Sequence, residues 1–149
     1  MTIRVLLVDE HEQFANSLRS VLQFDADIEV VALVNSAQTA LEAMTRMPVD
    51  VVCVDMHIAG LGGIGTTRLL LQRFPQTRVI GLAIHDDPVQ VHAMIEAGAS
   101  GFVLNMDAGR DLAQAIRRLD ASEIYLSHSM IHCSACTASQ GTMSIIRPA

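Results

Sequence analysis

The chain alternates between short apolar runs and longer segments in which apolar residues fall on one side. The apolar runs, rich in β-branched residues, are Ile3–Val8, Ile28–Val34, Val51–Asp55, Arg78–Ala83 and Gly101–Leu104. Near-continuous apolar character over so few residues is typical of strands covered on both faces of a parallel sheet. The pattern therefore predicts five buried strands.

Each strand is followed by a segment with helical spacing of apolar residues. Start and stop signals support these helices: Ser36 and Asp87 are suited to cap a helix N-terminus, Pro88 to occupy a first helical position, and Gly98 to end a helix. A loop containing Gly60, Gly62 and Gly63 is expected before the third helix, which is marked by Ile64, Thr67, Leu71 and Phe74.

Strict alternation of strands and helices implies right-handed crossovers and a parallel sheet between two helical layers. We predict a flavodoxin-like, doubly wound α/β domain with five strands in the order 2-1-3-4-5 and five helices. In this order the switch point, where ligands bind, lies between strands one and three. Those strands end in Asp9, Glu10 and Asp55.

The 149 residues suit one domain, expected over residues 1–122, with residues 123–149 as a linker or tail. A net charge of -6 argues against binding of nucleic acid by this chain. No apolar run is long enough for a membrane span, and no signal peptide precedes the first strand, so we expect a cytoplasmic protein. The three cysteines, an odd number, do not form a secreted disulfide framework.

Three carboxylates at one sheet edge repel each other, and such a site favours bound protons or a hard divalent cation. Mg²⁺ is the natural candidate, bound weakly. A flavin phosphate would be repelled by these acidic residues, and no Ser or Cys on a strand-to-helix elbow indicates a hydrolase. We therefore expect a protein that is not an enzyme.

Several segments together resemble a response-regulator receiver domain of two-component systems, of the NarL/FixJ (LuxR-type) subfamily. They are Ile-Arg-Val-Leu-Leu-Val-Asp9-Glu10-His11, Val-Val-Cys-Val-Asp55, Leu-Ala83-Ile-His-Asp-Asp and Ala-Gly-Ala-Ser-Gly-Phe102-Val-Leu-Asn105. The resemblance covers residues 3 to about 127. It implies a phosphoprotein that receives a phosphoryl group from a sensor histidine kinase, passes the signal to transcription, and forms a homodimer, often through the face of helix four, strand five and helix five.

The resemblance also assigns roles to individual positions. Asp55 corresponds to the phosphoacceptor, Asp9 and Glu10 to the acidic pair that holds Mg²⁺, and His57 to the residue whose backbone carbonyl completes the metal site. Phe102 corresponds to the aromatic switch position.

Two switch positions depart from the pattern. Ala83 stands where a Thr or Ser is usual, and Asn105 stands where a Lys is usual. Ala83 offers no hydrogen bond, and Asn105 donates without charge. Two interpretations stay open: phosphorylation of Asp55, or an atypical receiver that dimerises or binds a partner independently of phosphorylation.

Two histidine clusters raise the question of a transition metal. His11, His57 and His85 are expected near the carboxylate edge, where solvated loop histidines are the more common outcome. In the tail, His128, His132, Cys133 and Cys136 contain a Cys-x-x-Cys core that suits zinc, but incidental residues of a linker are favoured.

A helix-turn-helix domain usually follows in NarL/FixJ-type regulators, and the last residues of this sequence lack its basic amphipathic helices. The chain is expected to be either a fragment of a longer regulator or a stand-alone receiver.

Overall fold

The computed structural model describes residues 2–119, 123–130 and 144–146. Over this part of the chain it shows one parallel sheet in the order β2-β1-β3-β4-β5-β6-β7. The strands are β1 (Ile3–Val8), β2 (Ile28–Val34), β3 (Val51–Asp55), β4 (Arg78–Ala83), β5 (Gly101–Leu104), β6 (Glu123–Leu126) and β7 (Ser144–Ile146). The helices are α1 (Glu12–Leu22), α2 (Ala37–Arg46), α3 (Gly62–Arg73), α4 (Pro88–Glu96) and α5 (Asn105–Arg118), with a short 3₁₀ helix, η1 (His128–Met130).

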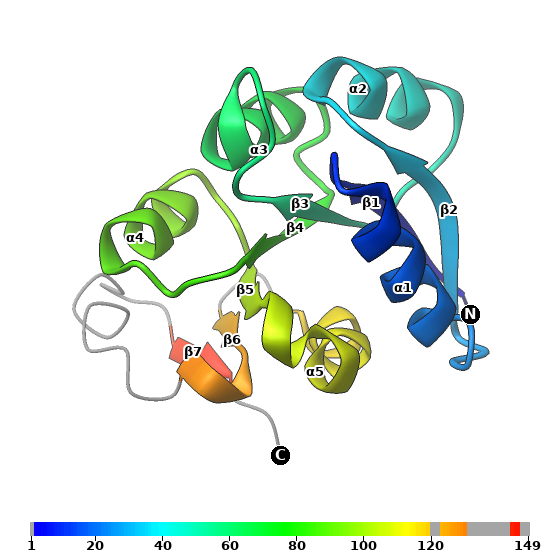
Figure 1. Cartoon of the computed structure of the whole chain (residues 1–149). Helices are drawn as coiled ribbons and strands as arrows, with labels where there is room; N and C mark the ends of the chain where they lie inside the picture. Colours follow the sequence, from blue (N-terminus) through cyan, green and yellow to red (C-terminus); the bar gives the residue numbers. More distant parts are fainter. Residues whose placement is uncertain (1, 120–122, 131–143, 147–149) are drawn as a thin grey trace.

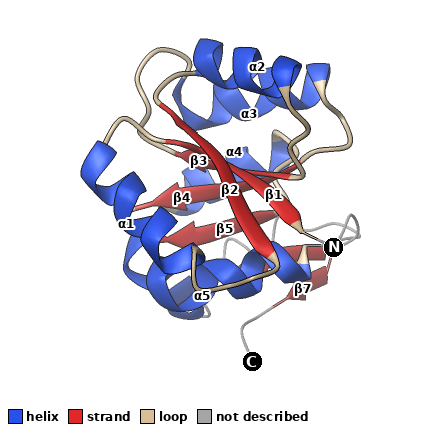
Figure 2. Cartoon of the chain, turned by 90° about the vertical axis from the view of Figure 1, so that its right-hand side faces the viewer, coloured by secondary structure: helices blue, strands red, loops and turns tan. Residues whose placement is uncertain are grey.

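Helices cover both faces of the sheet, as the alternating pattern predicts (Figures 1 and 2). Neighbouring residues of β1 show the division: Val5 and Leu7 pack in a cluster with buried residues of α1 and α5. Leu6 and Val8 pack on the opposite face, in a cluster with buried residues of α2, α3 and α4. None of the helices in the described residues is long and apolar enough to cross a membrane.

The capping signals act as expected. Ser36 and Thr39 form a reciprocal capping box at the start of α2, and the Asp87 carboxylate accepts from the Val89 N–H at the start of α4. Gly98 adopts φ +106° just after α4, a conformation that side chains disfavour.

The start of α3 differs from the expected glycine loop, because the helix already begins at Gly62. The Gly63 N–H donates to the Met56 carbonyl over 3.1 Å. A Cβ on Gly63 would lie 2.7 Å from the Met56 Cα, so the missing side chain lets α3 start directly against the end of β3. The glycines therefore serve close packing as well as the turn.

The prediction of five strands is wrong, because β6 adds to the edge of β5 and β7 adds to β6. β6 begins at Glu123, directly after the boundary expected at residue 122. In β6, Ile124 packs on one face and Tyr125 on the other, as in the central strands. Covering the β5 edge satisfies backbone groups that an edge strand leaves unpaired. The apolar run Ile124 to Leu126 is too short to stand out by periodicity.

Two buried carboxylates on α5 hold the residues after β6. Asp107 accepts hydrogen bonds from the Ser127 hydroxyl at 2.7 Å, the Ser129 N–H at 2.9 Å and the Ser129 hydroxyl at 2.7 Å. Asp111 accepts from the His128 N–H at 2.8 Å. Burial works to raise the pKa of Asp107, but the bonds from Ser127 and Ser129 outweigh it and keep the pKa below its ordinary value.

Replacing Asp107 by Asn should lower the free energy of unfolding by about 2 to 3 kcal/mol at neutral pH, since it leaves buried donors poorly matched. The lowered pKa of Asp107 means that its stabilising effect is present at neutral pH and is lost as pH falls through the folded-state pKa, below the ordinary value of 3.8. Urea denaturation followed by circular dichroism measures the effect. The exposed α2 carboxylate Glu42 provides the control Glu42→Gln, and equal stability of both variants would contradict the assignment.

Candidate functional site

The carboxyl ends of β1 and β3 bring two aspartates together. The two strands pair in parallel with Val8 opposite Val54, so Asp9 and Asp55 follow at the same edge of the sheet. Their exposed fractions are only 7% and 5%. Of the three carboxylates expected to meet at the switch point, Asp9 and Asp55 do so in the fold.

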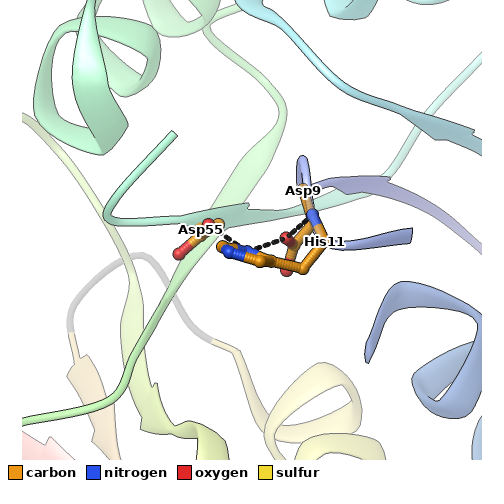
Figure 3. A group of neighbouring side chains, drawn as sticks. All are labelled: Asp9, His11 and Asp55. Atoms are coloured by element: carbon orange, nitrogen blue, oxygen red, sulfur yellow. Dashed lines mark hydrogen bonds and ion pairs between the residues drawn. The ribbon is translucent and has the colours of Figure 1, made fainter. Parts of the chain in front are cut away.

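The imidazole of His11 lies between the two carboxylates (Figure 3). Its Nδ1 is 3.2 Å from an Asp9 oxygen and 3.6 Å from Asp55 Oδ2. The His11 N–H also donates to Asp9 over 2.8 Å, which fixes the turn after β1 around the aspartate. His11 is thus the nitrogen-bearing side chain that the described structure places in the carboxylate cluster.

The two oxygens of Asp55 have different surroundings. Oδ1 accepts the His57 N–H over 3.1 Å, which orients the carboxylate. Oδ2 is fully buried and has no hydrogen-bond partner within the protein. A buried polar atom without a partner is costly unless a ligand or ion satisfies it, which makes Oδ2 the candidate ligand-binding atom of the cluster.

Burial and the neighbouring carboxylate also raise the pKa of Asp9. Burial raises the pKa of Asp9, the His11 N–H lowers it, and the neighbouring Asp55 carboxylate raises it. The net pKa lies above the ordinary value, which is the expected behaviour of a buried carboxylate near a like charge.

Glu10 lies apart from this cluster. Its side chain is exposed and turns toward the loop after β3, where its carboxylate accepts a hydrogen bond from the Ala59 N–H. His57 has an exposed side chain and meets Asp55 through its backbone N–H.

A cavity of about 600 Å³ opens beside Asp55. It is lined by His11, Gln13, Phe14, Asp55, His57, Ile84 and Asn105. Asn105 is the first residue of α5, and its Oδ1 atom is buried without a hydrogen-bond partner. Ala83, at the end of β4, is buried and has no polar side-chain atom.

Phe102 is 1% exposed and packs with the cluster on the α2, α3 and α4 side of the sheet. A Cβ on Gly81 would lie 3.2 Å from its ring. The aromatic side chain therefore points into the core in this structure.

The tail cluster is only partly described. His128 is exposed and lies 3.2 Å from the Arg110 guanidinium, through its Nδ1. His132, Cys133 and Cys136 lie outside the described residues.

Sequence patterns alone did not single out His11 from His57 and His85, because all three follow strands at the same edge. The sequence analysis also missed Asp107 and Asp111. Their i, i+4 spacing in line with the apolar positions of α5 is the signal that could have identified them.

Comparison with known proteins identifies close relatives of this architecture. Residues 5–120 match the family model of the response regulator receiver domain. The transcriptional regulatory protein DegU of Brevibacillus brevis is 30% identical over 87% of this chain and 55% of its own length. The transcriptional regulatory protein MctR of Rhizobium johnstonii is 32% identical over 84% of this chain and 58% of its own length. The chain thus spans little more than half of these relatives.

Solved structures agree with this similarity. A LuxR-family two-component response regulator from Aurantimonas sp. SI85-9A1 is 30% identical, with a TM-score of 0.74 over 78% of this chain and 84% of its own. The isolated apo REC domain of RcsB from Salmonella enterica serovar Typhimurium has a TM-score of 0.78 over 87% of this chain and 96% of its own. At 20% identity, the second likeness shows a shared fold.

Replacing Asp9 by Asn should stabilise the protein by about 1 kcal/mol at neutral pH without divalent cations, because it removes one of two adjacent charges. The pKa of Asp9 is raised in the folded state, so its ionisation costs stability as pH rises through that pKa. The advantage of the variant should therefore shrink as pH falls and the wild-type carboxyl takes up its proton. Thermal unfolding across pH 4 to 8 tests this, and a destabilised variant at neutral pH would contradict it.

Proposed function

Because the chain belongs to the response regulator receiver domains of two-component systems, we propose that Asp55 accepts a phosphoryl group from the phosphohistidine of a sensor kinase. The observation that carries this proposal is Asp55 Oδ2, a buried carboxylate oxygen without a hydrogen-bond partner, on a residue that lines an open cavity. Phosphoryl transfer depends mainly on positioning and on charge stabilisation, and the end of a central strand supplies the positioning.

The transfer exchanges one bond to phosphorus for another. Asp55 Oδ2 forms a bond to the phosphorus atom, the phosphorus–nitrogen bond breaks, and its electron pair stays on the kinase imidazole. The His57 N–H holds Asp55 Oδ1, so Oδ2 is the oxygen that remains without a protein partner for the transfer.

The carboxylates of Asp9 and Asp55 fit Mg²⁺, which prefers oxygen ligands and commonly uses one or two carboxylates. The pKa of Asp9, raised by burial and by the neighbouring Asp55 carboxylate, indicates a site that gains from a cation. We propose that the His57 carbonyl and Glu10 complete the site. Mg²⁺, when bound, neutralises charge on the transferred group. Because Glu10 bonds to Ala59 instead of joining the cluster, we expect weak binding of Mg²⁺.

The surroundings of the cavity support a second candidate function. Among the described residues that line it there is no Lys or Arg, Ala83 cannot donate a hydrogen bond, and Asn105 carries no charge. With no hydroxyl at Ala83 and no positive charge at Asn105, the link between phosphorylation of Asp55 and a change of conformation is weakened. A receiver that dimerises or binds its partner independently of phosphorylation is therefore the alternative.

We propose a role in transcription control, carried over from the relatives. DegU and MctR are transcriptional regulatory proteins, and the proposed role does not depend on direct nucleic-acid contact by this chain.

We also propose a homodimer that forms through the helices of the α4, β5 and α5 face, because β6 covers the β5 edge. Val89 on α4 and Met106 on α5 are 76% and 77% exposed and supply apolar surface.

Incubation with acetyl phosphate and Mg²⁺ should add one phosphoryl group, seen by intact mass spectrometry. Asp55→Asn should abolish the adduct, because it removes the nucleophilic oxygen. Asp86→Asn, which changes a carboxylate in the loop between β4 and α4, should retain the adduct. A folded wild-type protein that gains no adduct would favour the phosphorylation-independent alternative.

Replacing Asn105 by Lys should raise the rate of phosphorylation by about tenfold or more, since a charge-assisted hydrogen bond contributes roughly 1.5 to 3 kcal/mol. The ammonium group would enter the cavity that Asn105 lines. Asn105→Met has a comparable long side chain without charge and is the matched control. Equal rates for the two variants would show that the lost cation does not limit the reaction.

A further inference from the structure

Three potential ligand atoms of different chemistry converge at the carboxylate edge. One oxygen each from Asp9 and Asp55 and one ring nitrogen from His11 lie within 4.8 Å of one another (Figure 3). A carboxylate pair alone would suit a hard cation. The imidazole changes the donor set, because nitrogen ligands favour transition cations over Mg²⁺.

Asp55 Oδ2 gives an independent indication of a ligand. It is buried, has no hydrogen-bond partner, and lies 3.6 Å from His11 Nδ1. Asp55 as a whole is 5% exposed, so water has little access to this oxygen. A cation between Oδ2 and Nδ1 would satisfy the unpartnered atom.

We propose that Asp9, His11 and Asp55 form a metal site that binds a transition cation of the zinc class, in competition with Mg²⁺ for the Asp55 carboxylate. The donor set supports this class of cation, because an imidazole nitrogen beside two carboxylates suits zinc better than Mg²⁺. His11 Nδ1 is 3.2 Å from Asp9, with which it forms a hydrogen bond, and 3.6 Å from Asp55, so a bound cation would replace that hydrogen bond.

The surroundings orient these ligands. The His57 N–H holds Asp55 through Oδ1 and leaves Oδ2 for the cation. The His11 N–H holds Asp9 and fixes the start of the histidine side chain. The His11 side chain is 70% exposed, so a cation can reach the site and the ring can adjust. Three protein ligands leave one tetrahedral position open to a small ligand.

A loaded site would inhibit phosphoryl transfer, a consequence that rests on the proposed function. The cation would engage Asp55 Oδ2, the oxygen that must form the bond to phosphorus. Metal binding itself does not require phosphorylation, so it can be measured without a phosphodonor.

The test uses the full chain with Cys133→Ser and Cys136→Ser, so that the tail thiols cannot bind the added metal. Zn²⁺ and Mg²⁺ affinities are measured separately by calorimetry, and Co²⁺ binding is followed by its visible absorption. We expect one Zn²⁺ per chain. His11→Gln should weaken Zn²⁺ binding by about 10- to 100-fold and change Mg²⁺ binding by less than about twofold. His92→Gln is the matched control, because it alters a half-exposed histidine on α4 that lies outside the carboxylate cluster, and it should leave both affinities unchanged.

His11→Glu tests the donor type directly and guards against a folding defect in a single variant. An all-oxygen set should reverse the preference, with weaker Zn²⁺ and tighter Mg²⁺ binding. Circular dichroism confirms that each variant is folded. Unchanged Zn²⁺ affinity in folded His11→Gln, or an equal loss of Zn²⁺ and Mg²⁺, would overturn the proposed site. A Co²⁺ spectrum that depends on His11 in a protein that acetyl phosphate does not modify would support the metal site and refute the phosphorylation proposal.

Discussion

The constraint on which the functional edge depends is the burial of two carboxylates side by side. Pairing of β1 with β3 brings Asp9 and Asp55 together, and neither residue is more than 7% exposed. Like charges in such a place repel, and the raised pKa of Asp9 reflects both the burial and the repulsion. The central strands hold the two carboxylates in this arrangement, and a positive charge placed between them would relieve the repulsion.

The loss of a cation elsewhere in the site increases the importance of His11. Neither Ala83 nor Asn105 supplies positive charge near Asp55, and the cavity lining in the described part of the chain contains no Lys or Arg. His11 Nδ1 lies within 3.6 Å of both carboxylates. The same imidazole can form a hydrogen bond with a carboxylate or coordinate a metal. The donor atoms around it decide which cation the site of Asp9, His11 and Asp55 prefers.

Hydrophobic periodicity predicts the central fold well because each inner strand is buried on two faces. It fails at β6, where three apolar residues are too few to distinguish a strand from a linker. The meeting of Asp9 with Asp55 follows from strand order alone. The different directions of Glu10 and His11 do not, since both follow β1 and only their side-chain contacts separate them. Glu10 bonds to Ala59, whereas His11 turns between the aspartates.

The segment directly after β6 is hydrogen-bonded to the end of β5, next to the carboxylate site. The Leu104 N–H donates to the Ser127 hydroxyl over 3.0 Å, and that hydroxyl donates to Asp107. Leu104 directly precedes Asn105, which lines the cavity beside Asp55. If the junction between β5 and α5 moves, Ser127 must move with it or these buried hydrogen bonds must break. Breaking a buried hydrogen-bond network is costly, so a movement of this junction and a movement of the segment after β6 are coupled.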